Sequence, residues 1–346
     1  MLWFPAALYR LVTGVRNRLY DNGILRSHSF NVPVICVGNI TAGGTGKTPH
    51  VIYLAEKLAQ MTEVAVLSRG YLRRSRGFRM VTAADSVSNA GDEPLLMAGR
   101  PGAVKVFVDR DRVNGIREII RRYPSTGVVI LDDGFQHRAV KAGMNIVLTA
   151  YDRLMTRDHM LPLGRLRESP GALQRADMII VTKVPPAISG DEKDCIRQEL
   201  TSAGTNEIYF TGLKHEKIVP LFSGKDRDIT AGTSVLLVTG IANPAPLVTY
   251  ISGLAKNVKH IAFRDHHTFT AGDIAAIESS FGNLPSDDAI IVTTEKDAVR
   301  MKKIINIADR LAGIFYFLPV GIEFIDREND FLNRIYGYAG KDKENR

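Results

Sequence analysis

Short apolar segments rich in β-branched residues recur along the first two thirds of the chain, with helix-length segments between them. They lie at residues 32–37, 64–67, 105–108, 128–131, 145–149 and 178–182. Strands that are apolar on both faces and alternate with helices are typical of a parallel sheet covered by helices on both faces. We therefore predict an α/β fold built on such a sheet.

The alternation starts again after a polar segment at residues 223–232. Two further apolar segments, at 208–211 and 218–222, precede this polar segment, and those at 234–239, 259–263, 289–293 and 314–318 follow it. We expect the first two of these to pair as a β-ribbon, because only a short charged stretch separates them. The pattern predicts a first α/β domain at 31–206, a ribbon linker at 207–232 and a second, smaller α/β domain at 233–346 with a charged tail at 340–346.

Residues 1–30 have the pattern of an amphipathic helix. Their apolar positions recur at spacings of three and four, at Phe4, Leu8, Leu11, Val12, Val15 and Leu19, and three arginines lie among them. This helix either packs on the rest of the protein or lies on a membrane, with Trp3 and Phe4 in the interface and arginines toward lipid phosphates. The segment lacks the features of a signal peptide, and no stretch reaches the roughly 20 apolar residues that span a bilayer.

Composition adds few constraints to this picture. Of the 346 residues, 45% are hydrophobic and 24% are charged, which is the balance of a folded protein. The net charge of +8 favours anionic partners such as phosphates, anionic lipids or nucleic acid. The two cysteines, Cys36 and Cys195, are far apart and form no CxxC motif, which argues against a zinc site or a disulfide scaffold and suits a reducing compartment.

The strongest chemical motif is a glycine-rich loop between the first predicted strand and a helix, PVICVGNITAGGTGKTPHVIYLAEKL. Its candidate nucleotide-binding residues are Thr41, Gly43, Gly44, Thr45, Gly46, Lys47 and Thr48. The glycines let the backbone wrap around phosphates with its N–H groups inward. In a P-loop of this kind Lys47 contacts the β- and γ-phosphates of ATP, and the Thr48 hydroxyl binds Mg²⁺. Thr41 replaces the first glycine of the usual GxxxxGK(S/T) pattern.

An acidic pair, Asp132 and Asp133, follows the strand predicted at 126–131 in the motif VVILDDGFQHR. A P-loop needs a carboxylate for its metal ion, commonly at the end of a neighbouring strand. Successive strand residues point in opposite directions, so one carboxylate is expected to face the metal and the other to support it. The sequence does not decide which of the two does so.

Further polar motifs lie at the ends of predicted strands, where open α/β sheets have their ligand-binding sites. They are GDEP with Asp92 and Glu93, DHHTFT with His266 and His267, and TEKDAVR with Glu295 and Lys296. Each motif alone has an ordinary structural explanation: acids cap helices, and paired histidines are more often structural or on the surface than catalytic.

Taken together, the motifs resemble one family. GNITAGGTGKTP, SRGY, GDEP, DDGFQH, LPLGRLRE, VTGIANP, DHHTFT and TEKDAVR occur in the order and approximate spacing of the tetraacyldisaccharide 4′-kinases. Members of that family phosphorylate the 4′-hydroxyl of the disaccharide precursor of lipid A, using ATP and Mg²⁺. The resemblance covers nearly the whole chain, and in this family the first loop position is typically Ser or Thr, as at Thr41.

The resemblance implies a role for each matching residue. Lys47 and Thr48 match the nucleotide loop, and Asp132 and Asp133 match the metal-binding pair. Asp92 matches the acidic residue taken as catalytic base, and His266 matches the histidine that pairs with it. Further positions expected near the substrates are Glu93, Gln136, His137, Arg167, Glu295 and Lys296. Many relatives have Pro where this chain has Arg165, which leaves the role of Arg165 open.

Asp92 and His266 fall in different predicted domains, so we expect domain closure to assemble them once both substrates are bound. An acylated disaccharide stays in a bilayer, so the resemblance implies a peripheral enzyme at the cytoplasmic face of the bacterial inner membrane. The basic stretch at 69–79 is expected to help near anionic lipid. We expect a monomer that binds no nucleic acid.

Two other functions are weighed against the kinase. Membrane-associated P-loop ATPases of the partitioning type carry a lysine where this loop has Ala42, and the GDEP and DHH motifs also count against them. A basic nucleic-acid-binding module would have aromatic residues interleaved with its basic runs, and this chain lacks them.

Overall fold

The structure is a computed structural model that describes residues 2–100, 102, 104–205, 207–222, 224–285, 288–302, 304, 311 and 313–340. The predicted tail beyond residue 340 lies outside the described residues. The chain forms two compact units. The first consists of Met1–Asp85, Met97–Leu213 and Ile322–Arg346, and the second of Ser86–Leu96 and Lys214–Gly321.

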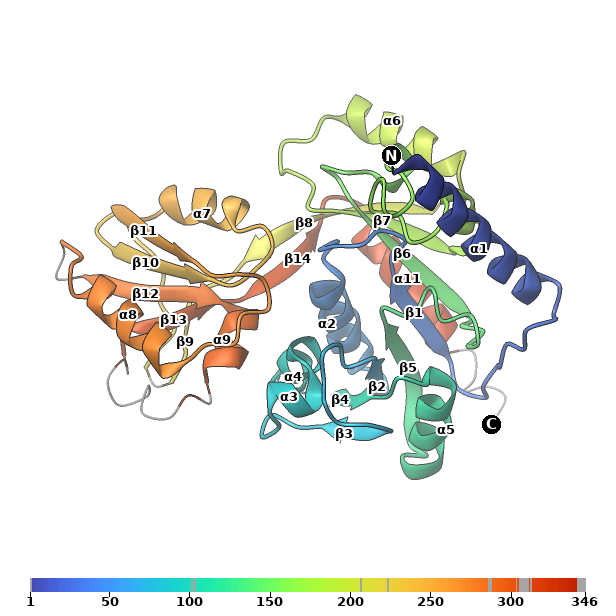
Figure 1. Ribbon diagram of the computed structural model, residues 1–346, viewed down its shortest axis with the longest axis horizontal. Coiled ribbons are helices and arrows are strands. Elements are labelled where there is room, and N and C mark those ends of the chain that lie inside the picture. Colours follow the sequence, from blue (N-terminus) through green and yellow to red (C-terminus); the bar gives the residue numbers. More distant parts are fainter. Residues whose placement is uncertain are drawn as a thin grey trace. The chain divides into compact units, whose positions relative to one another are not determined.

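The first unit is built on a mainly parallel sheet (Figure 1). Its strands are β1 (Val34–Gly38), β2 (Glu63–Ser68), β3 (Arg79–Val81), β4 (Val104–Val108), β5 (Thr126–Asp132), β6 (Met144–Ala150), β7 (Met178–Thr182), β8 (Ile208–His215) and β14 (Val320–Phe324). They lie in the order β14-β8-β7-β6-β1-β5-β2-β4-β3, and β3 runs antiparallel to β4. Every residue of β1 and β7 is buried, as expected for central parallel strands.

Helices cover both faces of this sheet. They are α1 (Trp3–Asp21), α2 (Lys47–Leu58), α5 (Arg112–Arg122), α6 (Gly190–Thr201) and α11 (Glu328–Gly340), with short 3₁₀ turns at Met155–Arg157 and Pro170–Arg175. One face packs on α5 and α6 through Ile116 and Ile196. The other packs on α2 and α11 through Leu54 and Phe331. The predicted α/β class, with helices on both faces, is therefore confirmed.

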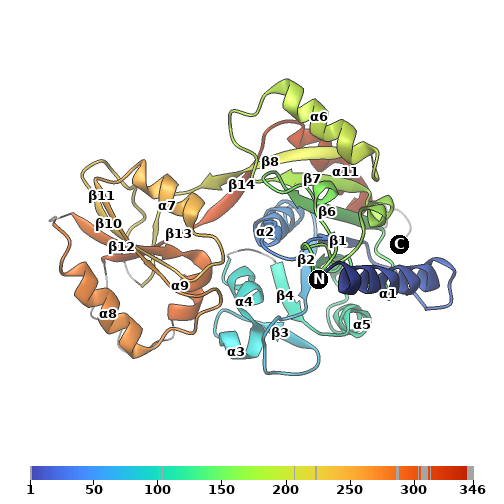
Figure 2. The same ribbon diagram turned by 45° about the horizontal axis from the view of Figure 1, so that its top comes forward.

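The second unit repeats the arrangement on a smaller scale. Its sheet runs β11 (Asn257–Ala262), β10 (Ser234–Thr239), β12 (Ala289–Thr294), β13 (Phe315–Leu318), β9 (Val219–Pro220). Helix α7 (Ala245–Ser252) covers one face, and α8 (Ala271–Phe281) and α9 (Glu295–Met301) cover the other (Figure 2). The short helix α3 (Val87–Ala90) and the start of α4 (Asp92–Ala98) also belong to this unit.

The predicted ribbon has different partners in the structure. Strand β8 pairs with β7 and β14, whereas β9 pairs antiparallel with β13. The chain passes from one unit to the other within β8 and again within β14. Closeness in sequence favoured a hairpin of 208–211 with 218–222, but the start of β8 is buried on both faces as part of the first sheet.

The unit boundaries also differ from the predicted domain boundaries. Residues beyond Ile322 return to the first unit, where Phe331 and Ile335 of α11 are buried and the Tyr338 hydroxyl bonds the backbone of Val34. Residues 86–96, predicted in the first domain, are grouped with the second unit. Side chains far apart in sequence make these contacts, so periodicity could not predict them.

Candidate active site

The glycine-rich loop follows β1 at the point where the order of the sheet reverses. β1 lies between β5 and β6, both parallel to it, and the loop connects its carboxyl end to α2. Open α/β sheets bind ligands at such a reversal. Gly43 and Gly46 have φ of 116° and 81°, in the left-handed region that glycine adopts without strain. Gly46 immediately precedes α2, so the loop leads directly into a helix N-terminus.

Three successive carbonyl groups of this loop are each held by a side chain from outside it. The contacts are Lys183 Nζ to Gly44 O at 2.6 Å, Thr182 Oγ1 to Thr45 O at 2.9 Å, and His50 Nδ1 to Gly46 O at 2.7 Å. In a peptide unit the C=O and the following N–H point in opposite directions. Holding the three carbonyls at these side chains therefore turns the N–H groups that follow them, including those of Gly46 and Lys47, to the other side, as phosphate binding requires.

His50 is neutral in this arrangement. It is buried, and burial lowers its pKa from 6.5 to about 4. A carbonyl can only accept, so the ring proton is on Nδ1, which donates to Gly46 O. Nε2 is then an acceptor, and the Thr211 hydroxyl on β8 donates to it at 3.0 Å.

The other side of the loop pairs with the segment that contains Arg165 and Arg167. The Ala42 N–H donates to Arg165 O, and the Arg167 N–H donates to Ile40 O, both at 2.7 Å. Thr41, between these contacts, is buried. The contribution of Arg165 to the loop is thus made by its backbone carbonyl, which a proline at that position would also provide.

The acidic pair divides into two environments, because β5 ends at Asp132 and Asp133 begins a turn. Asp132 ends β5, is buried, and accepts a hydrogen bond from the Ser68 hydroxyl at 2.8 Å. Asp133 has a left-handed φ of 51° and turns toward the loop. Its carboxylate lies 3.4 Å from Lys47 Nζ and 3.2 Å from Arg167 Nη1. Burial raises the pKa of Asp133, but the charges of Lys47 and Arg167 outweigh burial and lower it below its usual value.

The donor set around Lys47 fits Mg²⁺. Thr48 supplies a hydroxyl on the first turn of α2, and Asp132 and Asp133 supply carboxylates. Within the described residues, no three His, Cys, Asp or Glu side chains gather into a metal site of their own. Mg²⁺ is usually held by one or two carboxylates together with substrate phosphates, and hard oxygen donors of this kind suit it.

Gln136 and His137 lie beside the loop rather than on it. The Gln136 amide donates to Asn39 O at 2.8 Å, while its own backbone carbonyl accepts from Arg16 of α1 at 2.6 Å. His137 is half-buried, and burial followed by the charge of Arg112 lowers its pKa. The residues that follow the acidic pair thus connect the start of the loop to α1.

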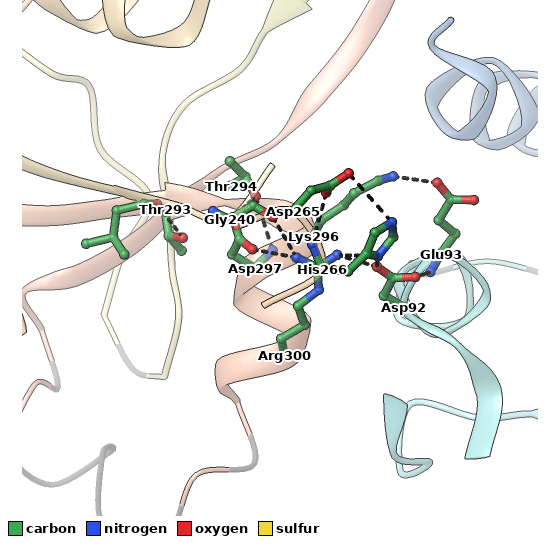
Figure 3. Close-up of polar contacts among 11 residues, drawn as sticks. Asp92, Glu93, Gly240, Asp265, His266, Thr293, Thr294, Lys296, Asp297 and Arg300 are labelled. Carbon is green, nitrogen blue, oxygen red and sulfur yellow. Dashed lines mark hydrogen bonds and ion pairs between the residues drawn. The ribbon is translucent and has the colours of Figure 1, made fainter. Parts of the chain in front are cut away.

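The second unit contains the other predicted pair, and Figure 3 shows its surroundings. Asp92 begins α4, and its Oδ2 lies 2.9 Å from Nδ1 of His266. His266 follows β11 with a left-handed φ of 57°. Both residues belong to the second unit, whereas the predicted domain boundaries separated them, and the pair is formed in the structure. That domain closure on substrate binding assembles it stays a prediction.

The other residues that the sequence motifs singled out here lie in the same unit. Lys296 on α9 forms an ion pair with Glu93, the residue after Asp92. Burial lowers the pKa of Lys296, but Glu93 and Asp92 outweigh burial and raise it. His267 does not join the pair: its Nε2 lies 3.0 Å from Asp273, which belongs to the capping box at the start of α8. Glu295 is the first residue of α9.

Two residues of this network were not predicted from the sequence. Arg300 forms an ion pair with Asp92, and its Nη1 lies 2.8 Å from Asp297 Oδ1 (Figure 3). Both belong to the TEKDAVR motif and lie one helical turn apart. This motif was the feature of the sequence from which they could have been predicted. Burial raises the pKa of Asp92, but the hydrogen bond and charge of Arg300 outweigh it, so the pKa is lower than usual.

The chain is similar to known proteins over nearly its whole length. A family described as Tetraacyldisaccharide-1-P 4′-kinase matches residues 1–338. The chain is 42% identical to a tetraacyldisaccharide 4′-kinase of Phocaeicola vulgatus, covering 99% of this chain and 96% of that one. It is 40% identical to one of Flavobacterium johnsoniae, covering 99% and 97%. The crystal structure of LpxK from Aquifex aeolicus in complex with ATP is similar, with a TM-score of 0.75 and 29% identity over 96% of both chains.

Proposed function

Because the chain belongs to the tetraacyldisaccharide 4′-kinase family, we propose that it transfers the γ-phosphoryl group of ATP to the 4′-hydroxyl of the tetraacyldisaccharide 1-phosphate precursor of lipid A. The observation that carries the proposal beyond nucleotide binding is the pair of Asp92 and His266. A kinase must prepare the hydroxyl of a second substrate, whereas in an ATPase of the partitioning type the acceptor is water.

The loop residues would bind the nucleotide. Backbone N–H groups at the start of α2 and the Lys47 ammonium would contact the phosphates, and Thr48, Asp132 and Asp133 would hold Mg²⁺. When bound, Mg²⁺ neutralises charge on the phosphate oxygens. Asp133 orients Lys47 through their ion pair, and Arg167 on the other side of Asp133 adds a second positive charge to the site.

The pair in the second unit would handle the acceptor's proton. The Asp92 carboxylate is ionised, because Arg300 lowers its pKa, and it takes the proton of the 4′-hydroxyl as the sugar oxygen bonds to the γ-phosphorus. The bond from the γ-phosphorus to the bridging oxygen breaks, and ADP leaves with that oxygen. His266 acts as a positioning residue, because its Nδ1 proton is donated to Asp92.

Helix α1 supports an approach to lipid. Trp3, Phe4 and Leu11 are 69%, 80% and 62% exposed, and Ala6 is the buried residue of the helix. Nothing in the described part of the chain is a helix with the length and hydropathy to cross a bilayer. We propose that this exposed apolar face lies in the surface of an anionic membrane, at the cytoplasmic face of the bacterial inner membrane, with the protein as a peripheral monomer.

Part of the basic stretch at 69–79 is engaged within the protein. Arg73 is buried and donates to Gly77 O at 2.8 Å, and Arg79 forms an ion pair with Asp85. The contribution of this stretch to lipid binding would therefore come from its other arginines.

A labelled-phosphate assay tests the function. The purified chain is incubated with γ-labelled ATP and Mg²⁺, and with tetraacyldisaccharide 1-phosphate in mixed micelles, with a polynucleotide, or with no acceptor. We expect label in the lipid only. Release of labelled inorganic phosphate at the same rate in all three reactions would instead support an ATPase.

Variants of the pair test its role. Asp92→Asn should lower kcat by about 10²–10⁴, the usual effect of a general base. His266→Ala should lower it less, because the carboxylate remains, and the two losses should not add in the double variant. The affinity for ATP should change little, because neither side chain is assigned to the nucleotide. Losses in kcat that multiply would show that the two residues act independently.

A further inference from the structure

We propose that Arg300 is the positioning residue for Asp92: anchored by Asp297 and Gly240, it fixes the Asp92 carboxylate against His266 and balances its charge. This inference rests on the proposed function, in which Asp92 accepts the proton of the acceptor hydroxyl. It also gives a role to VTGIANP and TEKDAVR, the motifs that supply Gly240, Asp297 and Arg300.

The guanidinium of Arg300 has little freedom to move. The side chain is 5% exposed, and Nη1 donates to Asp297 Oδ1 at 2.8 Å and to Gly240 O at 3.0 Å. The other terminal nitrogen, Nη2, donates to Asp92 Oδ2. A guanidinium is planar and its donors are fixed relative to one another. Holding Nη1 at two acceptors therefore fixes the direction in which Nη2 reaches Asp92.

The anchor is itself tied to the ends of two strands. Asp297 is completely buried, and its Oδ2 accepts from Gly240 N at 2.8 Å and from the Thr294 hydroxyl at 2.7 Å. Thr294 ends β12, and Gly240 follows β10. A Cβ at position 240 would lie 2.9 Å from Asp297 Oδ1, so this close approach needs glycine. The orientation of Arg300 is thus set by the sheet of the second unit.

The charges around Asp92 make Arg300 necessary. Two buried carboxylates, Asp92 and Asp297, share one guanidinium (Figure 3). The other charged or titratable groups near Asp92 are His266, Lys296 with its partner Glu93, and Asp265, which lies 3.8 Å from His266 Nε2. A buried carboxylate that loses its cation takes up a proton more readily. A protonated Asp92 could not accept the proton of the sugar hydroxyl.

The geometry also assigns the hydrogen at His266. Nδ1 lies 2.9 Å from Asp92 Oδ2 and 3.1 Å from Arg300 Nη2. An ionised carboxylate can only accept hydrogen bonds, so Nδ1 carries the ring proton and donates it to Asp92. Asp92 Oδ2 therefore receives two donors, one from each side, while Oδ1 accepts from the Glu93 N–H at 3.0 Å. These three bonds hold the carboxylate in one orientation.

The test compares two substitutions over a pH series of lipid phosphorylation. Arg300→Gln removes the charge, so kcat should fall at least about tenfold and the acid limb of kcat/KM should move up by about 1–3 pH units, the usual effect of an adjacent arginine. Arg300→Lys keeps the charge but loses the fixed donor nitrogens of the guanidinium. The acid limb of its kcat/KM profile should therefore stay near that of the wild type while kcat falls. The Kd for ATP should be unchanged in both.

Arg227→Gln is the matched control. It removes another arginine–aspartate pair of the second unit, Arg227 with Asp288 at 3.0 Å, and should leave the pH profile unchanged. If Arg300→Gln does not fold, Asp297→Asn takes its place, because it loosens the anchor and leaves the cation. It should lower kcat with little movement of the acid limb.

An unmoved acid limb in folded Arg300→Gln, or wild-type kcat in both Arg300→Lys and Asp297→Asn, would overturn the inference. The proposed function is checked separately by Asp92→Asn. If that variant keeps wild-type kcat, the assignment of the base is wrong. If it is inactive while the Arg300 variants are normal, only the role of Arg300 is rejected.

Discussion

Lys47 is placed by its neighbours before any nucleotide arrives. Its side chain is 12% exposed, and its ammonium lies 3.4 Å from Asp133, which also faces Arg167. The loop backbone around it is held by Thr182, Lys183 and His50. A charge and a set of N–H groups fixed in advance need little reorganisation when a phosphate binds, which is where electrostatic stabilisation is most effective.

Lys47→Ala should therefore lower kcat by about 10²–10³ while the protein stays folded, because in the proposed mechanism it removes a charge that contacts the transferred group. Lys57→Ala is the matched control, since Lys57 lies on the same helix and pairs with Glu328 at 3.4 Å on the surface. Turnover with labelled ATP and lipid acceptor measures the effect. Near-normal turnover in folded Lys47→Ala would reject the loop mechanism.

At the scale of elements, α1 combines two kinds of contact. Its later residues are tied to the protein by polar groups: Asn17 donates to Glu168 at 2.7 Å, and Arg138 bonds Asn17 O and Asp21. Its apolar side chains remain exposed along the helix. The sequence allowed either a packed helix or a membrane helix, and the described contacts show a helix fastened by its polar side.

Replacing Phe4, Leu8, Leu11 and Val15 by Gln should weaken binding to anionic vesicles at least about tenfold, because each apolar side chain gains roughly 1.5–3 kcal/mol when fully buried. Sedimentation with vesicles measures this, and the Kd for ATP should stay the same. The control replaces Met61 and Ile120 by Gln, because these two side chains are exposed elsewhere on the first unit. Equal sedimentation of the two variants would contradict a membrane-binding role for α1.

For the whole molecule, the buried neutral His50 makes stability depend on pH. Its pKa is about 4 in the folded protein, against an ordinary histidine value of 6.5, so between these values the unfolded chain binds the extra proton. The contribution of neutral His50 to the free energy of unfolding is present in full above about pH 6.5 and is lost as pH falls toward 4. The loss should reach about 3 kcal/mol, since one pKa unit corresponds to about 1.4 kcal/mol.

Urea unfolding of the nucleotide-free protein between pH 7.5 and pH 4.5 measures this effect. The free energy of unfolding should fall less steeply in His50→Gln than in the wild type, because glutamine does not titrate. His159→Gln, at an exposed histidine, should keep the wild-type slope. Identical slopes in all three proteins would show that His50 is not the group responsible.

The features that local chemistry specifies could be predicted from the sequence. Strand positions follow from runs of β-branched residues, and the phosphate loop follows from glycines between a strand and a helix. The order of the motifs identified the family, which the full-length matches confirm. The resemblance predicted that Asp92 pairs with His266, and in the structure Asp92 Oδ2 lies 2.9 Å from His266 Nδ1.

Which distant segments share a unit could be learned only from the folded chain. Residues 86–96 belong to the second unit, where Arg300 and Lys296 hold Asp92 and Glu93, and β14 rather than β9 pairs with β8. Hydrophobic periodicity reports which face of an element is buried but not which element covers it. Arg300 escaped prediction for the same reason: an arginine on a short helix is ordinary until its partner, 208 residues away, is placed beside it.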